Sequence, residues 1–140
     1  MSEQEIRELL AERTAAMQAK DPARLVAGYD PGAVKFDLAP PLRNTGTSAE
    51  YLTQWFGSFA SPVSYTYHDE AITTSGELAV VTALAKMSAV PQGASEPFTL
   101  WFRSTLVLRH GDDGWRIVHE HNSTPFYMDG TMRAAVDLQP

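Results

Sequence analysis

The sequence divides into a helical part and a strand part, and the change comes at Pro62. Before it, apolar residues recur every three to four positions, as in the segment 2–20. After it they alternate, beginning with Val63, Tyr65 and Tyr67 between polar neighbours. Helices that precede a run of hairpin-linked strands indicate an α+β domain with an antiparallel sheet, not an alternating α/β fold.

The helical part predicts three helices with one strand among them. Asp21 and Pro22 have the residue types of an N-cap and a first helical position, and Ser48 has that of a second N-cap. The expected order is a helix over 2–20, a short helix that includes Tyr29 and ends at 30–32, a strand over 33–38, a loop over 39–47, and a helix after Ser48.

The strand part predicts a meander of four strands over 63–68, 78–90, 98–109 and 115–122, with hairpin turns at 75–77 and 110–114. The two long central strands carry apolar residues at both odd and even positions, which predicts a sheet that is covered on both faces. We expect the helices on one face and the C-terminal tail or a second copy of the chain on the other. The chain is therefore predicted to be a homodimer.

Composition fits a single domain over residues 1–140. A chain of this length buries about 68% of the surface that its unfolded form exposes, which is enough for a hydrophobic core that needs no disulfide or metal to stabilise it. It has no cysteine, which excludes disulfides, thiolate metal sites and a cysteine nucleophile. The net charge of −6, without a Lys/Arg cluster, argues against nucleic-acid partners. No membrane-spanning run and no signal peptide are recognised, so we expect a cytoplasmic protein without a membrane partner.

The last hairpin carries the densest group of ionisable side chains. If its strands pair about residues 111–114, alternation places Arg103, His119 and His121 on one face, together with Trp115 and Ile117. The opposite face would hold Phe102, Ser104, Leu106, Val118, Glu120 and Asn122. Alternation alone leaves open which face lines a pocket, and a bulge would mix the two sets.

Two interpretations of this group are kept. In the first, Arg103 binds a carboxylate or enolate oxygen of a ligand, and a histidine transfers a proton. In the second, the same residues form a hydrogen-bond network under a dimer interface, with Glu120 paired to an arginine of a neighbouring strand. His119 and His121 also have the spacing of metal ligands, but residues 122–125 supply no further carboxylate, so no metal site is expected.

Asp37 is an independent candidate, at the end of the first strand and before a proline-rich loop. A carboxylate that faces an apolar cavity there would have the raised pKa of a general base. Otherwise Asp37 would pair with Arg43 or Arg103, or cap a turn.

Trp55 belongs to the apolar stripe of the third helix and could form a pocket wall. The sequence contains no phosphate-binding glycine loop, and no cofactor is expected.

The segments 102–105 and 113–126, the latter with the pattern Trp-x-Ile-x-His-x-His-x-Ser, resemble the SnoaL-like and ketosteroid isomerase-like branch of the nuclear transport factor two-like superfamily. The segment 36–43, Gly46 and Trp55 are similar to its N-terminal half. The resemblance implies a cystatin-like, cone-shaped barrel in which a curved, mostly antiparallel sheet wraps around the N-terminal helices, with an open pocket and usually a homodimer through the outer face.

The resemblance implies that an aspartate such as Asp37 removes a proton next to a carbonyl group, whereas Ser104 or Leu106 stands where the isomerase has its protonated acid. The expected catalytic residues are Asp37, His119 and His121, and the expected ligand-binding residues are Arg103, Arg43, Trp55 and Glu120. Family members include isomerases, polyketide cyclases, dehydratases and hydrolases, and kinase association domains that only assemble or bind.

Two functions remain open at this stage. The first is an isomerase, cyclase or dehydratase that acts by proton transfer on a small carbonyl compound. The second is a non-catalytic module for ligand binding or dimerisation. The expected partners are a small apolar or carbonyl-containing molecule and a second copy of the chain.

Overall fold

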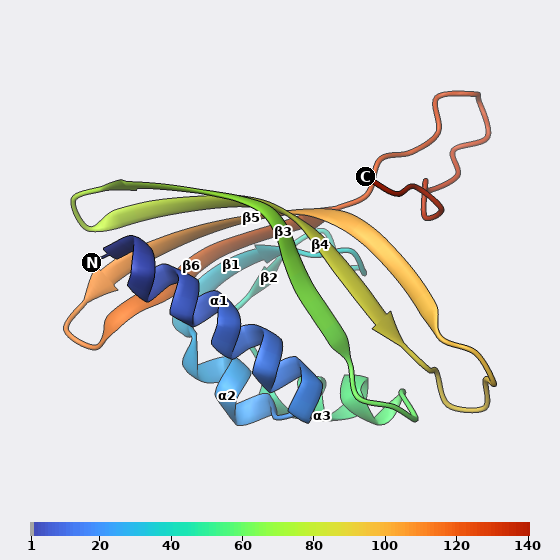
Figure 1. The fold of residues 1–140 in the computed structure, drawn as a ribbon, viewed down its shortest axis with the longest axis horizontal. Coiled ribbons are helices and arrows are strands. Elements are labelled where there is room, and N and C mark those ends of the chain that lie inside the picture. The colour runs from blue at the N-terminus through green and yellow to red at the C-terminus, as the bar shows by residue number, and fades with distance from the viewer. Residues whose placement is uncertain (1) are drawn as a thin grey trace.

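The computed structural model describes residues 2–140, and this part of the chain forms three helices and one six-stranded sheet. The elements are α1 (Ser2–Ala19), α2 (Pro22–Ala27), β1 (Tyr29–Phe36), β2 (Asn44–Thr45), α3 (Ala49–Gly57), β3 (Ser64–Ser75), β4 (Leu78–Ala89), β5 (Phe98–Gly111) and β6 (Gly114–Ser123). Figure 1 shows the long, curved sheet passing over the three helices, which lie on its concave side. The predicted α+β class is confirmed.

The strand order is β2-β1-β6-β5-β4-β3. Strands β3 to β6 form the expected antiparallel meander, whereas β1 pairs with β6 in parallel. This parallel pair places the first strand along the chain, β1, beside the last one, β6. Side chains from the N-terminal and C-terminal parts of the chain therefore lie next to each other.

The predicted caps form. The Asp21 carboxylate accepts a hydrogen bond from the Arg24 N–H at 3.3 Å, and the Ser48 hydroxyl accepts one from the Tyr51 N–H at 3.1 Å. The prediction that Tyr29 belongs to the second helix was wrong. Gly28 caps that helix, and Tyr29 begins β1, where it pairs with Ile117. The short strand β2 was not predicted.

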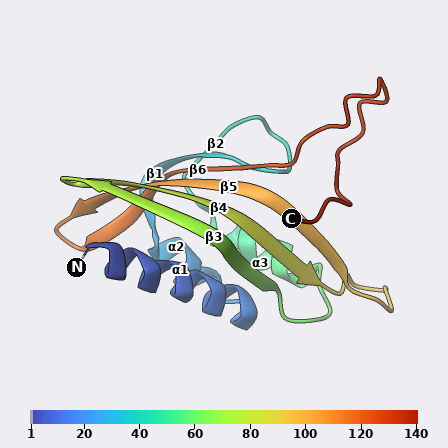
Figure 2. The same ribbon diagram turned by 45° about the horizontal axis from the view of Figure 1, so that its top comes forward.

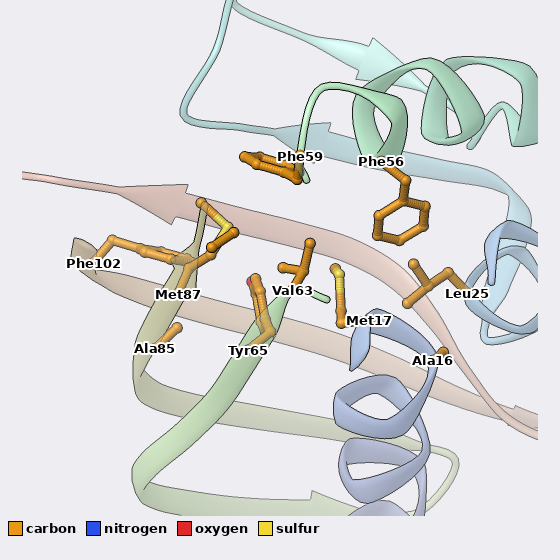
Figure 3. Packing of buried hydrophobic residues seen from close by; sticks show 11 residues of the cluster. Ala16, Met17, Leu25, Phe56, Phe59, Val63, Tyr65, Ala85, Met87 and Phe102 are labelled. Carbon is orange, nitrogen blue, oxygen red and sulfur yellow. The ribbon is translucent and has the colours of Figure 1, made fainter. Parts of the chain in front are cut away.

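The core consists of two apolar clusters that Tyr67 of β3 contacts in common. Figure 3 shows the first cluster, in which α1, α2 and α3 pack on β3, β4 and β5. Its labelled members include Met17, Leu25, Phe56, Tyr65, Met87 and Phe102. Helix α1 contributes to both clusters through one buried stripe, and Arg13 lies in that stripe.

A bulge in the last hairpin changes the faces predicted by alternation. Thr105 pairs with His121 and Val107 with His119, but Leu108 pairs with Ile117, so Val118 is an extra residue in β6. His119 and His121 share the outer face with Arg103, as predicted. The prediction that Trp115 and Ile117 lie on that face was wrong. They precede the bulge and lie on the buried inner face, and Glu120 and Asn122 share that face because the extra residue reverses the alternation after Ile117.

Residues 124–140 form a hairpin-like arm beyond β6. Phe126 and Ala134 form an isolated bridge, and the Tyr127 N–H donates to the Arg133 carbonyl at 2.8 Å. Figures 1 and 2 show this arm standing away from the sheet. Its exposed large apolar side chains are Phe126, Met128, Met132, Val136 and Leu138. No helix within residues 2–140 has the length and apolarity needed to cross a membrane.

Candidate functional site

A cavity of about 340 Å³ lies between the concave face of the sheet and the helices. This volume is in the range of small-molecule sites. Its apolar walls include Met17, Leu25, Trp55, Met87 and Phe102, and Figure 3 shows four of these side chains, all but Trp55. Its polar lining includes Arg13, Tyr29, Lys35, Asp37, Glu120 and Asn122. The cavity is therefore an apolar chamber with one polar wall.

The centre of the polar wall is an ion pair between Arg13 of α1 and Glu120 of β6. Arg13 Nη2 lies 3.2 Å from Glu120 Oε2, and both side chains are almost completely buried. Arg13 also donates from Nε to the Tyr67 hydroxyl at 2.9 Å and from Nη2 to the Tyr29 hydroxyl at 3.1 Å. The Tyr29 hydroxyl in turn donates to Glu120 Oε1 at 2.5 Å. The buried charges are thus paired and hydrogen-bonded, which burial requires.

These contacts determine the protonation states of the pair. Burial alone would raise the pKa of Glu120, but the charge of Arg13 and the hydrogen bonds from Tyr29 and Asn122 outweigh it, so that this pKa lies below its ordinary value. Burial would lower the pKa of Arg13, but the oxygens of Tyr29, Tyr67 and Glu120 raise it well above its ordinary value. Burial raises the pKa of Tyr29. At neutral pH the pair is ionised, and Tyr29 is a neutral donor.

Asp37 lies at the opening of the cavity, directly after β1. Its Oδ1 accepts hydrogen bonds from the Leu38 N–H at 2.8 Å and from Asn122 Nδ2 at 3.3 Å. The same Asn122 nitrogen donates to Glu120 Oε2 at 3.2 Å, so Asn122 connects the two carboxylates. Within residues 2–140, Asp37 forms no ion pair. Its carboxylate is therefore available to a ligand, whereas that of Glu120 is already neutralised.

A second, wider hollow of about 840 Å³ adjoins the cavity on its open side. Tyr29, Lys35, Asp37, Thr47 and Tyr51 line both hollows. The outer recess, as we name this hollow, is also lined by Asp30, Asn44 and Arg116. Asp37 thus stands where the outer recess meets the inner cavity.

The structure separates the residues that the sequence analysis grouped into one site. Asp37, Trp55 and Glu120 line the cavity. Arg103, His119 and His121 lie on the outer face of the sheet instead. His119 donates from Nδ1 to the Val34 carbonyl at 2.7 Å, and both histidine rings pack edgewise on Phe36, at 4.9 and 5.4 Å between ring centroids. Arg43 is exposed in the loop before β2 and lines neither hollow.

The sequence alone did not identify Arg13, Tyr29, Lys35 and Asn122 as cavity residues. For Arg13 the sequence did contain a signal, since it stands between Leu10 and Met17 in the buried stripe of an amphipathic helix. Glu120 does pair with an arginine, as one interpretation expected, but that arginine comes from a helix and not from a neighbouring strand. In the part of the chain that the structure describes, no three His, Asp or Glu side chains are grouped so that they could hold a metal ion.

Solved structures with the same fold cover most of the chain. An NTF2-like protein of unknown function from Pseudomonas putida KT2440 is 26% identical, over 98% of this chain and 95% of its own, with a TM-score of 0.84. A Novosphingobium aromaticivorans protein, provisionally named as a scytalone dehydratase, is 17% identical over 96% and 91%, with a TM-score of 0.76. The CaMKII hub of S. rosetta is 26% identical over 84% and 92%, with a TM-score of 0.66.

No curated protein matches the sequence. The model of the SnoaL-like domain family, however, matches residues 6–127, which is most of the chain. With the six-stranded sheet and the NTF2-like neighbours, this match shows that the chain belongs to the SnoaL-like family of the NTF2-like superfamily.

Proposed function

We propose that the cavity binds a small carbonyl compound and that Asp37 removes a proton from the carbon next to the carbonyl group. The observation that carries this proposal is the difference between the two cavity carboxylates. Glu120 is neutralised by Arg13 and Tyr29, whereas Asp37 has no ion-pair partner within residues 2–140 and stands at the opening. A general base must have a free carboxylate within reach of the substrate.

The proposed step is a proton abstraction that forms an enolate. The Asp37 carboxylate takes the proton, the C–H electron pair forms a carbon–carbon double bond, and the carbonyl electron pair moves onto oxygen. The buried Arg13 and the nearby Lys35 supply positive charge for that oxygen. The protonated Asp37 then returns its proton to another carbon of a conjugated enolate, or to a β-hydroxyl group that leaves as water. Alternatively the enolate attacks an electrophile within the same molecule, and the oxyanion that forms takes the proton from Asp37. These three outcomes are isomerisation, cyclisation and dehydration.

The roles of the remaining predicted residues follow from their positions. We assign Trp55 to the apolar wall that contacts the ligand, and Glu120 to the orientation of Arg13 and Asn122. Arg103, His119 and His121 have no part in the proposed step, because they lie on the opposite face of the sheet from the cavity. Arg43 has no part in it either.

Exchange of carbon-bound hydrogen for deuterium tests the step directly. The probe is 1-indanone in D₂O, whose protons next to the carbonyl group are followed by NMR. The wild-type protein should accelerate their exchange, and Asp37→Asn should reduce that acceleration by about 100-fold or more, the usual contribution of a general base. Asp112→Asn, in the exposed turn between β5 and β6, is the matched control. Equal exchange by wild type and Asp37→Asn would overturn the proposal.

A second candidate function, assembly, is supported by the outer face of the sheet. Leu78 and Val80 of β4 are exposed there, and Trp101 and Val107 of β5 are only half-buried. A similar structure is the hub of a kinase. We propose that the chain forms a homodimer through this face, independently of the chemistry in the cavity.

A further inference from the structure

The C-terminal arm, residues 124–140, holds half of the exposed large apolar side chains within residues 2–140. These arm side chains are Phe126, Met128, Met132, Val136 and Leu138. Such a concentration on a folded surface marks a site of contact with a partner. We infer that, in the proposed homodimer, the arm of each copy packs on the outer face of the other copy's sheet. The inference rests on the proposed assembly and names the segment that makes the contact.

The arm has a structure of its own. Phe126 and Ala134 form a bridge, the Ala135 N–H donates to the Pro125 carbonyl at 2.8 Å, and the Tyr127 hydroxyl donates to the Asp137 carboxylate. All hydrogen bonds that the structure shows for residues 124–140 join two arm residues. A segment that already holds its shape loses little conformational entropy when it docks on another surface.

The outer face of its own sheet is not the surface that covers the arm. The arm begins after Ser123, which pairs with Arg103 of β5. Figures 1 and 2 show that the chain leaves the sheet at this point and continues away from it. The outer face is therefore left with Leu78 and Val80 exposed and Trp101 half-buried. The arm and this face are two uncovered apolar surfaces, and a second copy supplies each with the other.

The arm is long enough for this contact. Its outward limb, residues 124–130, extends at most about 20 Å at about 3.3 Å per residue. Neighbouring strands lie about 4.8 Å apart, so this length crosses about four strands of a partner's sheet. In a twofold dimer the contact occurs twice, since each copy both gives an arm and receives one.

The charges of the two surfaces are complementary. Strands β4 and β5 contain no acidic residue, and their pairing places Lys86, Arg103 and Arg109 on the outer face. Within residues 2–140, none of these three cations forms an ion pair. Two such faces in direct contact would bring like charges together, which is unfavourable. The arm contains Asp129 and Asp137 and a single arginine, so it brings negative charge to the basic face.

A spin label on the arm tests whether it reaches a second copy. The chain contains no cysteine, so Met132→Cys provides one attachment point for a nitroxide. This variant is mixed with isotope-labelled wild type, whose NMR signals then report only effects from the other copy. We expect the amide signals around Val80 and Trp101 to broaden beyond detection. The same label at Gln18→Cys, an exposed position of α1, is the control and should leave these signals unchanged.

Light scattering on an arm variant gives a second, independent measurement. Met128→Asp combined with Met132→Asp places two charges in the proposed apolar contact, and it should raise the dissociation constant of the dimer by more than about tenfold. The circular dichroism spectrum should not change, because both side chains are exposed in one chain. Leu42→Asp is the matched control, since Leu42 is 96% exposed like Met128 but lies outside the arm. This variant should remain a dimer.

The possible outcomes separate the arm exchange from the homodimer itself. A dimer in which the label on Met132→Cys leaves the outer-face signals unchanged would overturn the inference and leave the homodimer in place. So would an undiminished dimer affinity in the Met128→Asp and Met132→Asp double variant. A wild type with the mass of one chain would refute both. None of these results bears on proton abstraction by Asp37, which the deuterium exchange of 1-indanone tests separately.

Discussion

Arg13 and Glu120 form a buried ion pair at 3.2 Å although 107 positions separate them in the chain. The contact holds helix α1 against the inner face of the sheet, between the two apolar clusters. It also occupies the carboxylate that would otherwise be the most deeply buried base in the cavity. The stability of the fold and the identity of the proposed base therefore depend on the same pair.

Removing one member of this pair should destabilise the protein strongly. Glu120→Gln leaves Arg13 buried without a counter-charge, and we expect a loss of about 3–5 kcal/mol in the free energy of unfolding. Urea titration followed by circular dichroism measures it. Replacing both partners, as Arg13→Met with Glu120→Leu, should recover most of the loss because no lone charge remains. Glu12→Gln, which breaks the exposed pair with Arg24, is the control and should change stability far less. A comparable loss in the control would contradict the prediction.

The same carboxylate should contribute to stability in a pH-dependent way. Burial opposes the shift, but Arg13, Tyr29 and Asn122 hold the pKa of Glu120 below its ordinary value of 4.5. A lowered pKa in the folded state gives stability that is present above pH 4.5 and is lost as the pH falls through the lowered value. The difference in unfolding free energy between wild type and Glu120→Gln should be constant from pH 7 to about 5 and should shrink in more acidic solution. A difference that grows on acidification would disprove the assignment.

The variant His121→Ala tests whether the histidine on the outer face takes part in the proposed reaction. His121 was expected from the sequence to be catalytic, but its ring lies on the outer face against Phe36. We expect the variant to exchange the protons of 1-indanone within about twofold of wild type, because a general acid or base would contribute about 100-fold. A loss of exchange rate comparable to that of Asp37→Asn would show that His121 does take part in the reaction.

The outer face predicts the state of assembly. Light scattering should give twice the mass of one chain for the wild type. Val80→Asp, which places a charge beside the exposed Leu78 near the start of β4, should give the mass of one chain with an unchanged circular dichroism spectrum. Ser95→Asp, in the exposed loop between β4 and β5 at the other end of these strands, should remain dimeric. A wild type that runs as a single chain at micromolar concentration would refute the homodimer.

Local features of the sequence were sufficient to predict most of the fold. The caps at Asp21 and Ser48 and the alternation after Pro62 act over a few residues, and all three are confirmed. The start of β1 could not be located this way, because Tyr29 becomes a strand residue through its pairing with Ile117. Local patterns report local hydrogen bonds, whereas this boundary depends on a distant strand.

The candidate site was only partly predictable for the same reason. Asp37, Trp55 and Glu120 were identified, but their partner Arg13 is brought to the cavity by packing between segments far apart in the sequence. The positions of the histidines depended on the register of the hairpin, which a single extra residue shifts. The residue types thus indicated that acid–base chemistry is possible. Which of these residues line the same cavity became clear only from the strand register and the helix packing in the structure.

The bulge at Val118 has a consequence for how such domains diversify. In an uninterrupted β6 that continued from Ile117, His119 and His121 would point inward, and Glu120 and Asn122 would point outward. The gain or loss of one codon in this hairpin therefore exchanges an imidazole-lined chamber for one lined by a carboxylate and an amide, without any substitution at those positions. Two relatives with the same histidine pattern can consequently have different side chains in the cavity. For this hairpin, a one-residue gap in an alignment is therefore as informative as an identical residue.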